Sequence, residues 1–278
     1  MQNKRYFNNL DERINKLSYC AFIDVLGYKN MILESFHDNN SKRYFEEYYE
    51  LISWLENEFL NHNKFVEPPL YTYKLFTDNF VLNYPFNANT YIEELKAFLI
   101  IIGQMQMRFL LSGVLLRGGI ALGLIHSDDK VIVGPALIEA YELESIKAVY
   151  PRIIFSSRLK NQIDRRIEFF RNRVLIDSYD NYFLEDKDGI LFLNYLYIAI
   201  CCEDVGSDYD ILAKHREFII SNIGITKDNH IFEKYNWLLE YHNYFCTLYS
   251  PVFQRDYSQF IVSKSSLNCS ITMLVNKT

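Results

Sequence analysis

A run of apolar residues near the start of the chain, within residues 18–28 (SYCAFIDVLGY), carries a single acidic residue, Asp24, and breaks at Gly27. A run this short, rich in Cys, Phe, Ile and Val, predicts a strand inside a sheet rather than a helix. Strand periodicity divides its side chains between two faces, with Cys20, Phe22 and Asp24 on one and Ala21, Ile23 and Val25 on the other. Burying an unpaired carboxylate is costly, so Asp24 is expected at the strand's end in a cleft, or beside a cation.

The residues after Asp24 predict a turn into a helix, because the apolar run breaks at Leu26-Gly27-Tyr28. Backbone N–H groups at such a turn point at whatever lies above the strand end, and this geometry suits an anion. A carboxylate and a phosphate, both negatively charged, lie side by side only when a metal ion such as Mg²⁺ or Mn²⁺ bridges them. The alternative is that Asp24 is an ordinary capping or turn residue.

The rest of the first 160 residues predicts a mixed set of elements. We expect these in order: a lead-in helix over 1–17, a helical segment over 30–63, two strands within 70–85, a helix over 91–109, strands over 114–127 and 130–133, a helix from 134 that ends before 151, and a strand over 152–155. Thr77-Asp78-Asn79 supplies the residue types of a tight turn between the two strands within 70–85. This order contains a βαββαβ unit of the ferredoxin-like, palm type, so the predicted fold class is α+β.

The remaining chain offers no motif to which chemistry can be assigned. Helices are expected over 158–173 and 232–249, and apolar segments over 174–177 and 189–200 flank an acidic turn. His242 is interpreted as a packed or surface histidine, because no second His or Cys lies at ligand spacing. We therefore divide the chain into a core, 1–160, and a mostly helical extension, 161–278, that packs on the core or forms a dimer interface.

Composition narrows the class of protein. The chain has 278 residues, of which 49% are hydrophobic and 16% aromatic, enough for a large packed core. A net charge of −6 provides no broad basic surface for nucleic acid. Five cysteines without zinc spacing fit a reducing cytosol, and no apolar run reaches the ~18 residues of a membrane span. With no signal-peptide pattern at the start, the expected location is the cytoplasm, away from membranes.

Four segments of the first 160 residues together resemble a known family. They are AFIDVLGY (21–28), KLFTDNFVL (74–82), LRGGIALGLI (116–125) and VGPALIEAYELE (133–144). In order and spacing they resemble the successive blocks of class III nucleotide cyclase catalytic domains, over roughly residues 15–160. The sequences of the last two segments are most similar to those of the bacterial pyrimidine cyclases of Pycsar anti-phage defence.

This resemblance implies a metal site. Asp24 falls on the first metal-binding Asp, with the carbonyl of Val25 as a further ligand, and Asp78 falls on the second. Two ions, Mn²⁺ or Mg²⁺, held by this pair would polarise the α-phosphate and neutralise charge on departing pyrophosphate. Taken alone, Asp78 is equally an ordinary turn residue.

The resemblance also implies a substrate site for a nucleoside triphosphate. Leu26, Gly27 and Tyr28 would hold phosphates through backbone amides. Lys74 occupies the position that reads the base in adenylyl cyclases, and Phe22 would stack on the base or narrow the pocket toward a pyrimidine. The ordinary alternatives are a solvated strand lysine and a core phenylalanine.

Several positions depart from the family pattern. Val131 stands where adenylyl cyclases carry an acidic base-reading residue, so a classical adenylyl cyclase is disfavoured. Ile138 and Glu142 stand where a transition-state Asn and Arg are usual, so charge stabilisation must come from elsewhere. Arg117 and Arg152 are the candidates for this catalytic role, although each is equally a surface or sheet-edge arginine.

Together these features predict a metal-dependent cyclase that converts UTP to 3′,5′-cyclic UMP and pyrophosphate. The resemblance implies a homodimer, and a product that acts as a second messenger on a separate effector protein. The choice of UTP over CTP follows the family group and no residue. The alternatives are a cytidylate cyclase, a purine cyclase, and a catalytically inactive cyclase-fold module that binds nucleotides.

Overall fold

The protein is described here from a computed structural model. The described residues are 4–37, 41–63, 71–89, 91–170, 179–202, 206–224, 228–262 and 272–273.

The first part of the chain forms a ferredoxin-like core. Its elements are β1 (Lys16–Leu26), α1 (Tyr28–His37), α2 (Ser41–Asn63), β2 (Thr72–Phe76), β3 (Asn79–Pro85), α3 (Tyr91–Leu111) and β4 (Leu115–Ser127). The strands lie in the order β2-β3-β1-β4, and each neighbouring pair is antiparallel. This is the order of a βαββαβ unit, so the predicted α+β fold class is confirmed.

The segment after β4 folds back onto the same sheet. It contains β5 (Ile132–Val133), α4 (Pro135–Glu142), a π-helical turn (Leu143–Lys147) and β6 (Ile153–Phe155), which runs parallel to β4. Helix α4 begins with Gly134 at its cap and Pro135 at its first position, as the sequence predicted. A side chain at Gly134 would lie 2.5 Å from the carbonyl oxygen of Leu124, and its φ of +152° favours glycine.

The C-terminal part adds strands to this sheet as well as helices. Its elements are α5 (Ser157–Phe170), a 3₁₀ turn (Tyr179–Tyr182), β7 (Phe183–Glu185), β8 (Leu191–Leu193), α6 (Tyr195–Cys202), α7 (Asp208–Ile223), α8 (Asn229–Phe253), a 3₁₀ turn (Ser258–Phe260) and β9 (Thr272–Met273). The sheet continues from β4 in the order β6-β8-β7-β9. One hydrophobic cluster contains side chains from both sides of residue 160, so the residues after 160 share a hydrophobic core with those before it.

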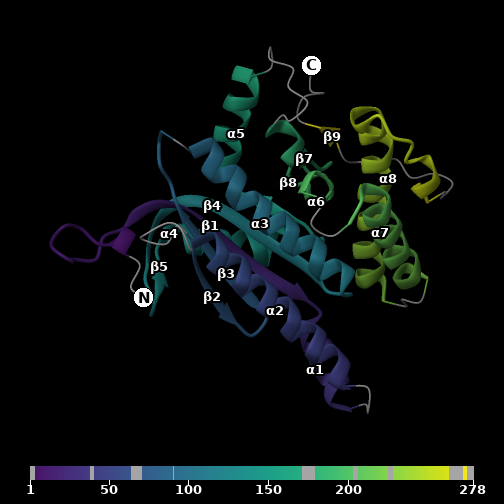
Figure 1. Cartoon of the computed structure of the whole chain (residues 1–278), viewed down its shortest axis with the longest axis horizontal. Coiled ribbons are helices and arrows are strands. Elements are labelled where there is room, and N and C mark those ends of the chain that lie inside the picture. Colours follow the sequence, from purple (N-terminus) through teal and green to yellow (C-terminus); the bar gives the residue numbers. More distant parts are fainter. Residues whose placement is uncertain are drawn as a thin grey trace.

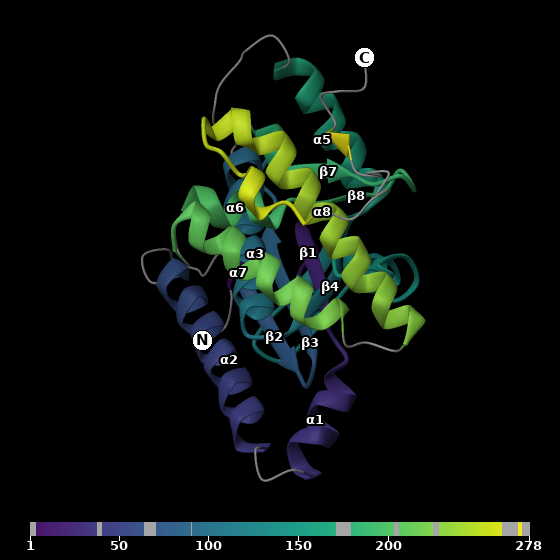
Figure 2. The same ribbon diagram turned by 90° about the vertical axis from the view of Figure 1, so that its right-hand side faces the viewer.

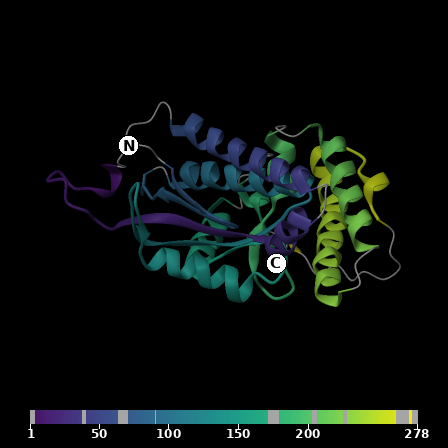
Figure 3. The same cartoon turned by 90° about the horizontal axis from the view of Figure 1, so that it is seen from below.

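Helices cover both faces of the sheet (Figure 1). Seen edge-on, the blue helices α2 and α3 lie on one side of the sheet and α4 lies on the other (Figure 3). Helices α7 and α8 stand against one end of the sheet, where Figure 2 shows them in front of β1 and β4. The end of β1 and the start of β4 therefore lie beside α8.

The predicted alternation along β1 is confirmed. Ala21, Ile23 and Val25 are buried in the main hydrophobic cluster together with side chains of α2 and α3. Cys20 and Phe22 belong to a smaller cluster beneath α4, so Asp24 shares the α4 side of the sheet. The carboxylate thus emerges from a strand that is packed on both faces.

Some predicted elements were wrong. The lead-in helix over 1–17 does not form. A 3₁₀ turn (Lys4–Tyr6) and a bridge between Phe7 and Arg13 precede β1 instead, and the Tyr6 side chain is fully buried with its hydroxyl 3.0 Å from that of Ser18. The helical segment over 30–63 is two helices, α1 and α2. The apolar segment 189–200 contains β8 and most of α6, whereas 174–177 lies outside the described residues.

Within the described part of the chain, no helix combines the length and the apolar character needed to cross a bilayer.

Candidate active site

An ion pair lies at the end of β1. Asp24 is paired in register with Asn79 of β3 on one side and with Arg117 of β4 on the other. The Nε of Arg117 donates to Oδ2 of Asp24 over 3.2 Å. Both side chains are only partly exposed, so Asp24 lies beside a cation, one of the two arrangements that the sequence predicted for a buried acid.

A second carboxylate shares the same arginine. Oε1 of Glu144, in the π-helical turn after α4, lies 2.8 Å from Nε of Arg117, and its side chain is nearly buried. A glycine on β4 permits this approach, because a Cβ at Gly119 would lie 2.4 Å from Cβ of Leu143 and 2.5 Å from the carbonyl oxygen of Ala140. The small glycine on β4 therefore allows a close backbone approach, which brings Glu144 to Arg117.

Asp78 lies at the turn between β2 and β3, beside the end of β1. Its carbonyl oxygen accepts a hydrogen bond from the backbone N–H of Val25 over 3.0 Å. Its Oδ1 accepts from the hydroxyl of Thr77 over 2.6 Å and from the amide of Asn79 over 3.0 Å. Thr77 has a φ of +54°, a left-handed conformation that the tight turn requires. The hairpin predicted from the Thr-Asp-Asn sequence therefore holds Asp78 next to β1.

The electrostatics indicate that three carboxylates share this region. Burial raises the pKa of Asp24, the neighbouring Arg117 opposes the rise, and the charge of Asp78 adds to it. Burial also raises the pKa of Glu144, where Arg117 again opposes and Asp24 and Asp78 contribute. One arginine thus offsets part of a concentrated negative charge, which a further cation would stabilise.

A tyrosine from α2 fixes the turn. The hydroxyl of Tyr48 donates to the carbonyl oxygen of Thr77 over 2.9 Å, and its ring lies 5.6 Å from that of Tyr28. Burial raises the pKa of Tyr48, and the charges of Tyr28, Asp78 and Asp24 raise it further. Tyr48 therefore remains a neutral donor beside the two aspartates, and Tyr28, expected at the phosphates, packs against it.

A cavity of about 320 Å³ adjoins the β1–α1 turn. Leu26 and Gly27 line it from that turn, where Gly27 has a φ of +79°. Lys234 and Tyr235 of α8 line it from the C-terminal part of the chain. Ile231 of α8 also lines it, and its other walls come from α1, the α3–β4 turn and the first residue of β4, with Asn30, Met31, Ser112, Gly113, Val114 and Leu115.

The two aspartates fit a hard divalent ion only together with oxygens from a ligand. Among the described residues, no group of three or more His, Cys, Asp or Glu side chains is placed to hold a metal. Mg²⁺ is often bound by one or two carboxylates with substrate phosphates completing its shell, and Asp24 and Asp78 form such a pair. An ion on Oδ2 of Asp24 would compete with Arg117 for that oxygen.

Lys74 and Phe22 lie on the same side of the sheet as Asp24, as their register shows. Each is directly across from Val81 of β3. The amine of Lys74 donates to the carbonyl oxygen of Asp129, in the turn between β4 and β5. The ring of Phe22 meets that of Tyr141 of α4 edge to face at 5.3 Å. Their roles toward a base remain predictions.

The structure does not bring the guanidinium of Arg152 to this cluster. Its side chain is 1% exposed, and Nη1 donates to Oδ2 of Asp186 over 2.6 Å while Nη2 contacts Asp188. The indole Nε1 of Trp237 donates to the same Asp186 oxygen over 2.6 Å. Arg152 thus binds β6 to the acidic turn before β8, and only Arg117 of the two candidate arginines lies with Asp24.

The three positions that depart from the cyclase pattern are exposed. Val131 lies before β5, and Ile138 and Glu142 lie on α4, all on the surface of this chain. None of them forms a hydrogen bond or ion pair with the described residues around Asp24. Among the described residues, Arg117 is the cation that is ion-paired with Asp24.

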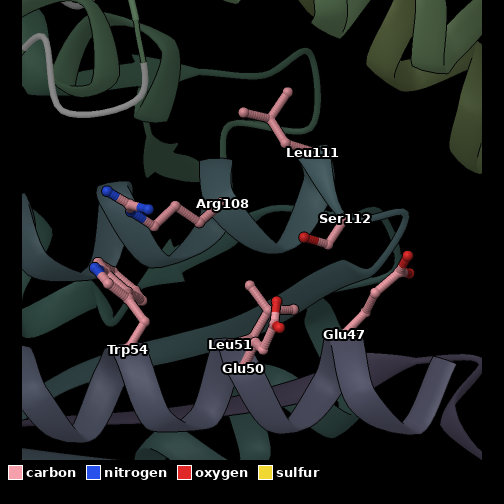
Figure 4. Close-up of a pocket in the computed structure, with 7 residues that line it drawn as sticks. All are labelled: Glu47, Glu50, Leu51, Trp54, Arg108, Leu111 and Ser112. Carbon is pink, nitrogen blue, oxygen red and sulfur yellow. The ribbon is translucent and has the colours of Figure 1, made fainter. Parts of the chain in front are cut away.

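A separate cavity of about 400 Å³ lies between α2 and α3 (Figure 4). The guanidinium of Arg108 lies 4.6 Å from the ring centroid of Trp54 across it. Glu47, Glu50, Leu51, Leu111 and Ser112 complete its lining. None of the predicted site residues lies in this cavity, so it is not part of the candidate site.

Sequence reasoning did not find three residues near the site. The only signal for Glu144 in the sequence is its position at the end of the segment 133–144, which follows the glycine-rich strand. Tyr48 and Lys234 are separated from Asp24 by long stretches of chain, and no spacing rule connects them. Only the packing of α2 and α8 reveals their place.

Comparisons with known proteins give a distant structural likeness. No protein-family model matches the chain, and no similar curated protein is found. Among solved structures, a class III adenylyl cyclase-like ATP-binding protein from Pseudomonas aeruginosa is similar with a TM-score of 0.40 and 11% identity. The likeness covers 52% of this chain and 34% of that one, so the match spans about a third of the neighbour's length. At this distance the likeness carries no functional conclusion.

Proposed function

We propose that this chain is a metal-dependent nucleotide cyclase that converts UTP to 3′,5′-cyclic UMP and pyrophosphate. One observation carries the proposal: two aspartates from separate segments meet at one end of a ferredoxin-like sheet. Asp24 ends β1, and Asp78 sits in the hairpin turn whose carbonyl oxygen binds the N–H of Val25 over 3.0 Å. Such a pair suits Mn²⁺ or Mg²⁺ bound to a triphosphate.

The proposed chemistry is an internal displacement. The ribose 3′-hydroxyl loses its proton to water and its oxygen bonds to the α-phosphorus, while the bond from that phosphorus to the bridging oxygen breaks and pyrophosphate leaves with the electron pair. Divalent ions held by Asp24 and Asp78, with the Val25 carbonyl as a further ligand, would supply charge neutralisation and acidify the 3′-hydroxyl. Arg117 lies beside Asp24 and is the arginine of this chain that can offset charge at the reacting phosphate.

The proposed preference for a pyrimidine is supported by the α4 side of the sheet. Phe22 and Tyr141 form an edge-to-face pair there, which narrows the space beside Asp24. Val131 carries no acidic group with which to read adenine, and the amine of Lys74 is bound to the carbonyl oxygen of Asp129. A smaller base with fewer polar contacts fits this arrangement better than a purine.

A homodimer and a downstream effector complete the proposal. Ile138 and Ile146 are 60% and 71% exposed, and Tyr141 and Val149 beside them are also exposed. Apolar side chains gathered on α4 and the following turn are typical of surfaces that a second protein covers. A second copy on this face would bring further cations to a site that is rich in carboxylates. The cyclic product would then act on a separate protein.

The decisive experiment is an assay with all four nucleoside triphosphates and Mn²⁺, with products resolved by chromatography. Cyclic UMP and pyrophosphate are the expected products. Cyclic CMP alone, or a cyclic purine nucleotide, would show that the proposed substrate is wrong and that the proposed reaction is right. No cyclic product from any of the four would refute the cyclase activity.

Variants test the two aspartates. Asp24→Asn and Asp78→Asn are expected to lower turnover at least about a hundredfold, because each removes a negative charge from the proposed binding site of the two metal ions. Asp129→Asn is the matched control, since its side chain lies exposed in the β4–β5 turn. Turnover in Asp24→Asn equal to that of the control would refute the metal assignment.

A second candidate function is a nucleotide-binding module without turnover. It is favoured by Arg117, whose Nε is already engaged by both Asp24 and Glu144, and by Ile138 and Glu142 in place of transition-state groups. This alternative predicts saturable triphosphate binding by calorimetry, with no cyclic product in the same samples.

A further inference from the structure

Lys234 reaches the candidate site from the C-terminal part of the chain. It lies near the start of α8 and lines the cavity of about 320 Å³ whose opposite wall is Leu26-Gly27. Among the described residues, no hydrogen bond or ion pair engages its amine. A partly buried cation without a partner therefore faces the turn that follows Asp24.

Lys234 lies between the N-terminal cap of α8 and the contact that ties this helix to the rest of the fold. The side chain of Asp228 caps the helix, accepting from the backbone N–H groups of His230 over 2.8 Å and Ile231 over 3.2 Å. Trp237 is buried, and its indole donates to Asp186. Trp237 thus ties α8 to the turn between β7 and β8, and Figure 2 shows this helix in front of the end of the sheet.

The charges of the candidate site act on Lys234. Burial lowers the pKa of Lys234, the charge of Arg117 lowers it further, and Asp228 and Asp24 oppose the change. The influence of Arg117 and Asp24 is consistent with the cavity geometry, which places the amine at the same end of the sheet. Lys234 therefore lies close enough to Arg117 and Asp24 for their charges to influence it.

We infer that Lys234 binds the terminal phosphates of the triphosphate, so that the C-terminal extension completes the substrate site. This inference rests on the proposed function. A lysine amine is a compact charge that suits phosphate oxygens, and a cavity of this size is at the lower end for small-molecule sites. Gly27, which also lines this cavity, has no side chain to cover its backbone, and nothing lies within 4 Å of where its Cβ would be.

The inference also resolves a problem of charge. Asp24, Asp78 and Glu144 repel a triphosphate, and Arg117 alone offsets part of their charge. Lys234 adds positive charge at the end of the cleft where the phosphates are expected, away from the Phe22 side where the base is expected. The extension is then a part of the site rather than a passive support.

Inorganic tripolyphosphate is the probe for this test, because it carries the terminal phosphates without base or ribose. Its binding to the full chain is measured by calorimetry at one Mg²⁺ concentration. Lys234→Met is expected to weaken binding by at least about tenfold, the loss typical of a charged hydrogen bond. Lys234→Arg is expected to retain most of the affinity. Lys214→Met, on the exposed side of α7, is the matched control.

The outcomes separate this inference from the proposed function. Equal tripolyphosphate affinity in Lys234→Met and the control, with both folded by thermal melting, would overturn the inference even if UTP is cyclised normally. Failure of the wild-type chain to bind tripolyphosphate would overturn it as well. A Lys234-dependent affinity without cyclic product would keep the inference and refute the cyclase. If Lys234→Met fails to fold, Lys234→Gln is compared with Lys234→Arg by the same criterion.

Discussion

A buried histidine pair makes the C-terminal part of the fold sensitive to acid. His242 Nε2 lies 3.0 Å from the carbonyl oxygen of Phe260, which can only accept, so Nε2 carries the proton. His242 Nδ1 is then an acceptor, 3.0 Å from Nδ1 of His215, which must donate. His215 Nε2 in turn accepts from the hydroxyl of Tyr195 over 2.6 Å. All four ring nitrogens have hydrogen-bond partners, so a proton added to Nδ1 of His242 would set two N–H groups against each other.

The magnitude follows from the shift in pKa. Burial lowers the pKa of His242 to about 4, and burial with the neighbouring His242 lowers the pKa of His215 well below its usual value. Between pH 6.5 and 4 the unfolded chain binds a proton that folded His242 does not, so stability is lost as the pH falls through this window. For His242 the loss is about 3 kcal/mol, from about 1.4 kcal/mol per unit.

Urea unfolding at a series of pH values between 7.5 and 4 measures this loss. His242→Gln removes one titrating ring and keeps an amide that can donate to the Phe260 carbonyl, so its stability is expected to fall less over the window. The exposed His230→Gln is the matched control and is expected to keep the wild-type loss. An equal fall in His242→Gln and in the wild-type chain would refute the reasoning.

Two further variants test packing near the site. Arg152→Met is expected to destabilise the chain by about 3–5 kcal/mol in urea unfolding, because Asp186 is left as an uncompensated buried charge. Full stability with lost turnover would instead restore the catalytic role first predicted for Arg152. Gly119→Ala is expected to cost about 1–3 kcal/mol and to lower the thermal midpoint, since its Cβ meets Leu143 and Ala140. Gly224→Ala, whose nearest contact is at 3.6 Å, is the control, and equal midpoints would contradict the close packing.

The local part of the site was predictable from the sequence. An acid at the end of an apolar strand, a Thr-Asp-Asn turn and a glycine-rich strand each carry a short-range signal, and the structure confirms the elements that they predicted. Asp24, Asp78 and Arg117 lie on neighbouring elements of the βαββαβ unit, so its strand order alone brings them to one edge of the sheet.

The remainder depended on contacts between distant segments. The charge of Arg152 suggested catalysis, but its partners Asp186 and Asp188 lie in a turn of β7–β8, and only the paired sheet shows that they meet. No motif or spacing in the sequence marked Lys234 as a site residue. The N-terminal residues resembled an amphipathic helix in sequence, but the burial of Tyr6 holds them in an irregular conformation before β1.

The continuity of the sheet past residue 160 limits how the protein can be dissected. A chain shortened there would leave β6 without β8 and uncover the apolar surface that α6, α7 and α8 now protect. Open strand edges of this kind attract other chains, so the shortened protein is expected to aggregate rather than to yield a working catalytic half. Both halves of the chain are therefore expected to fold only as one unit.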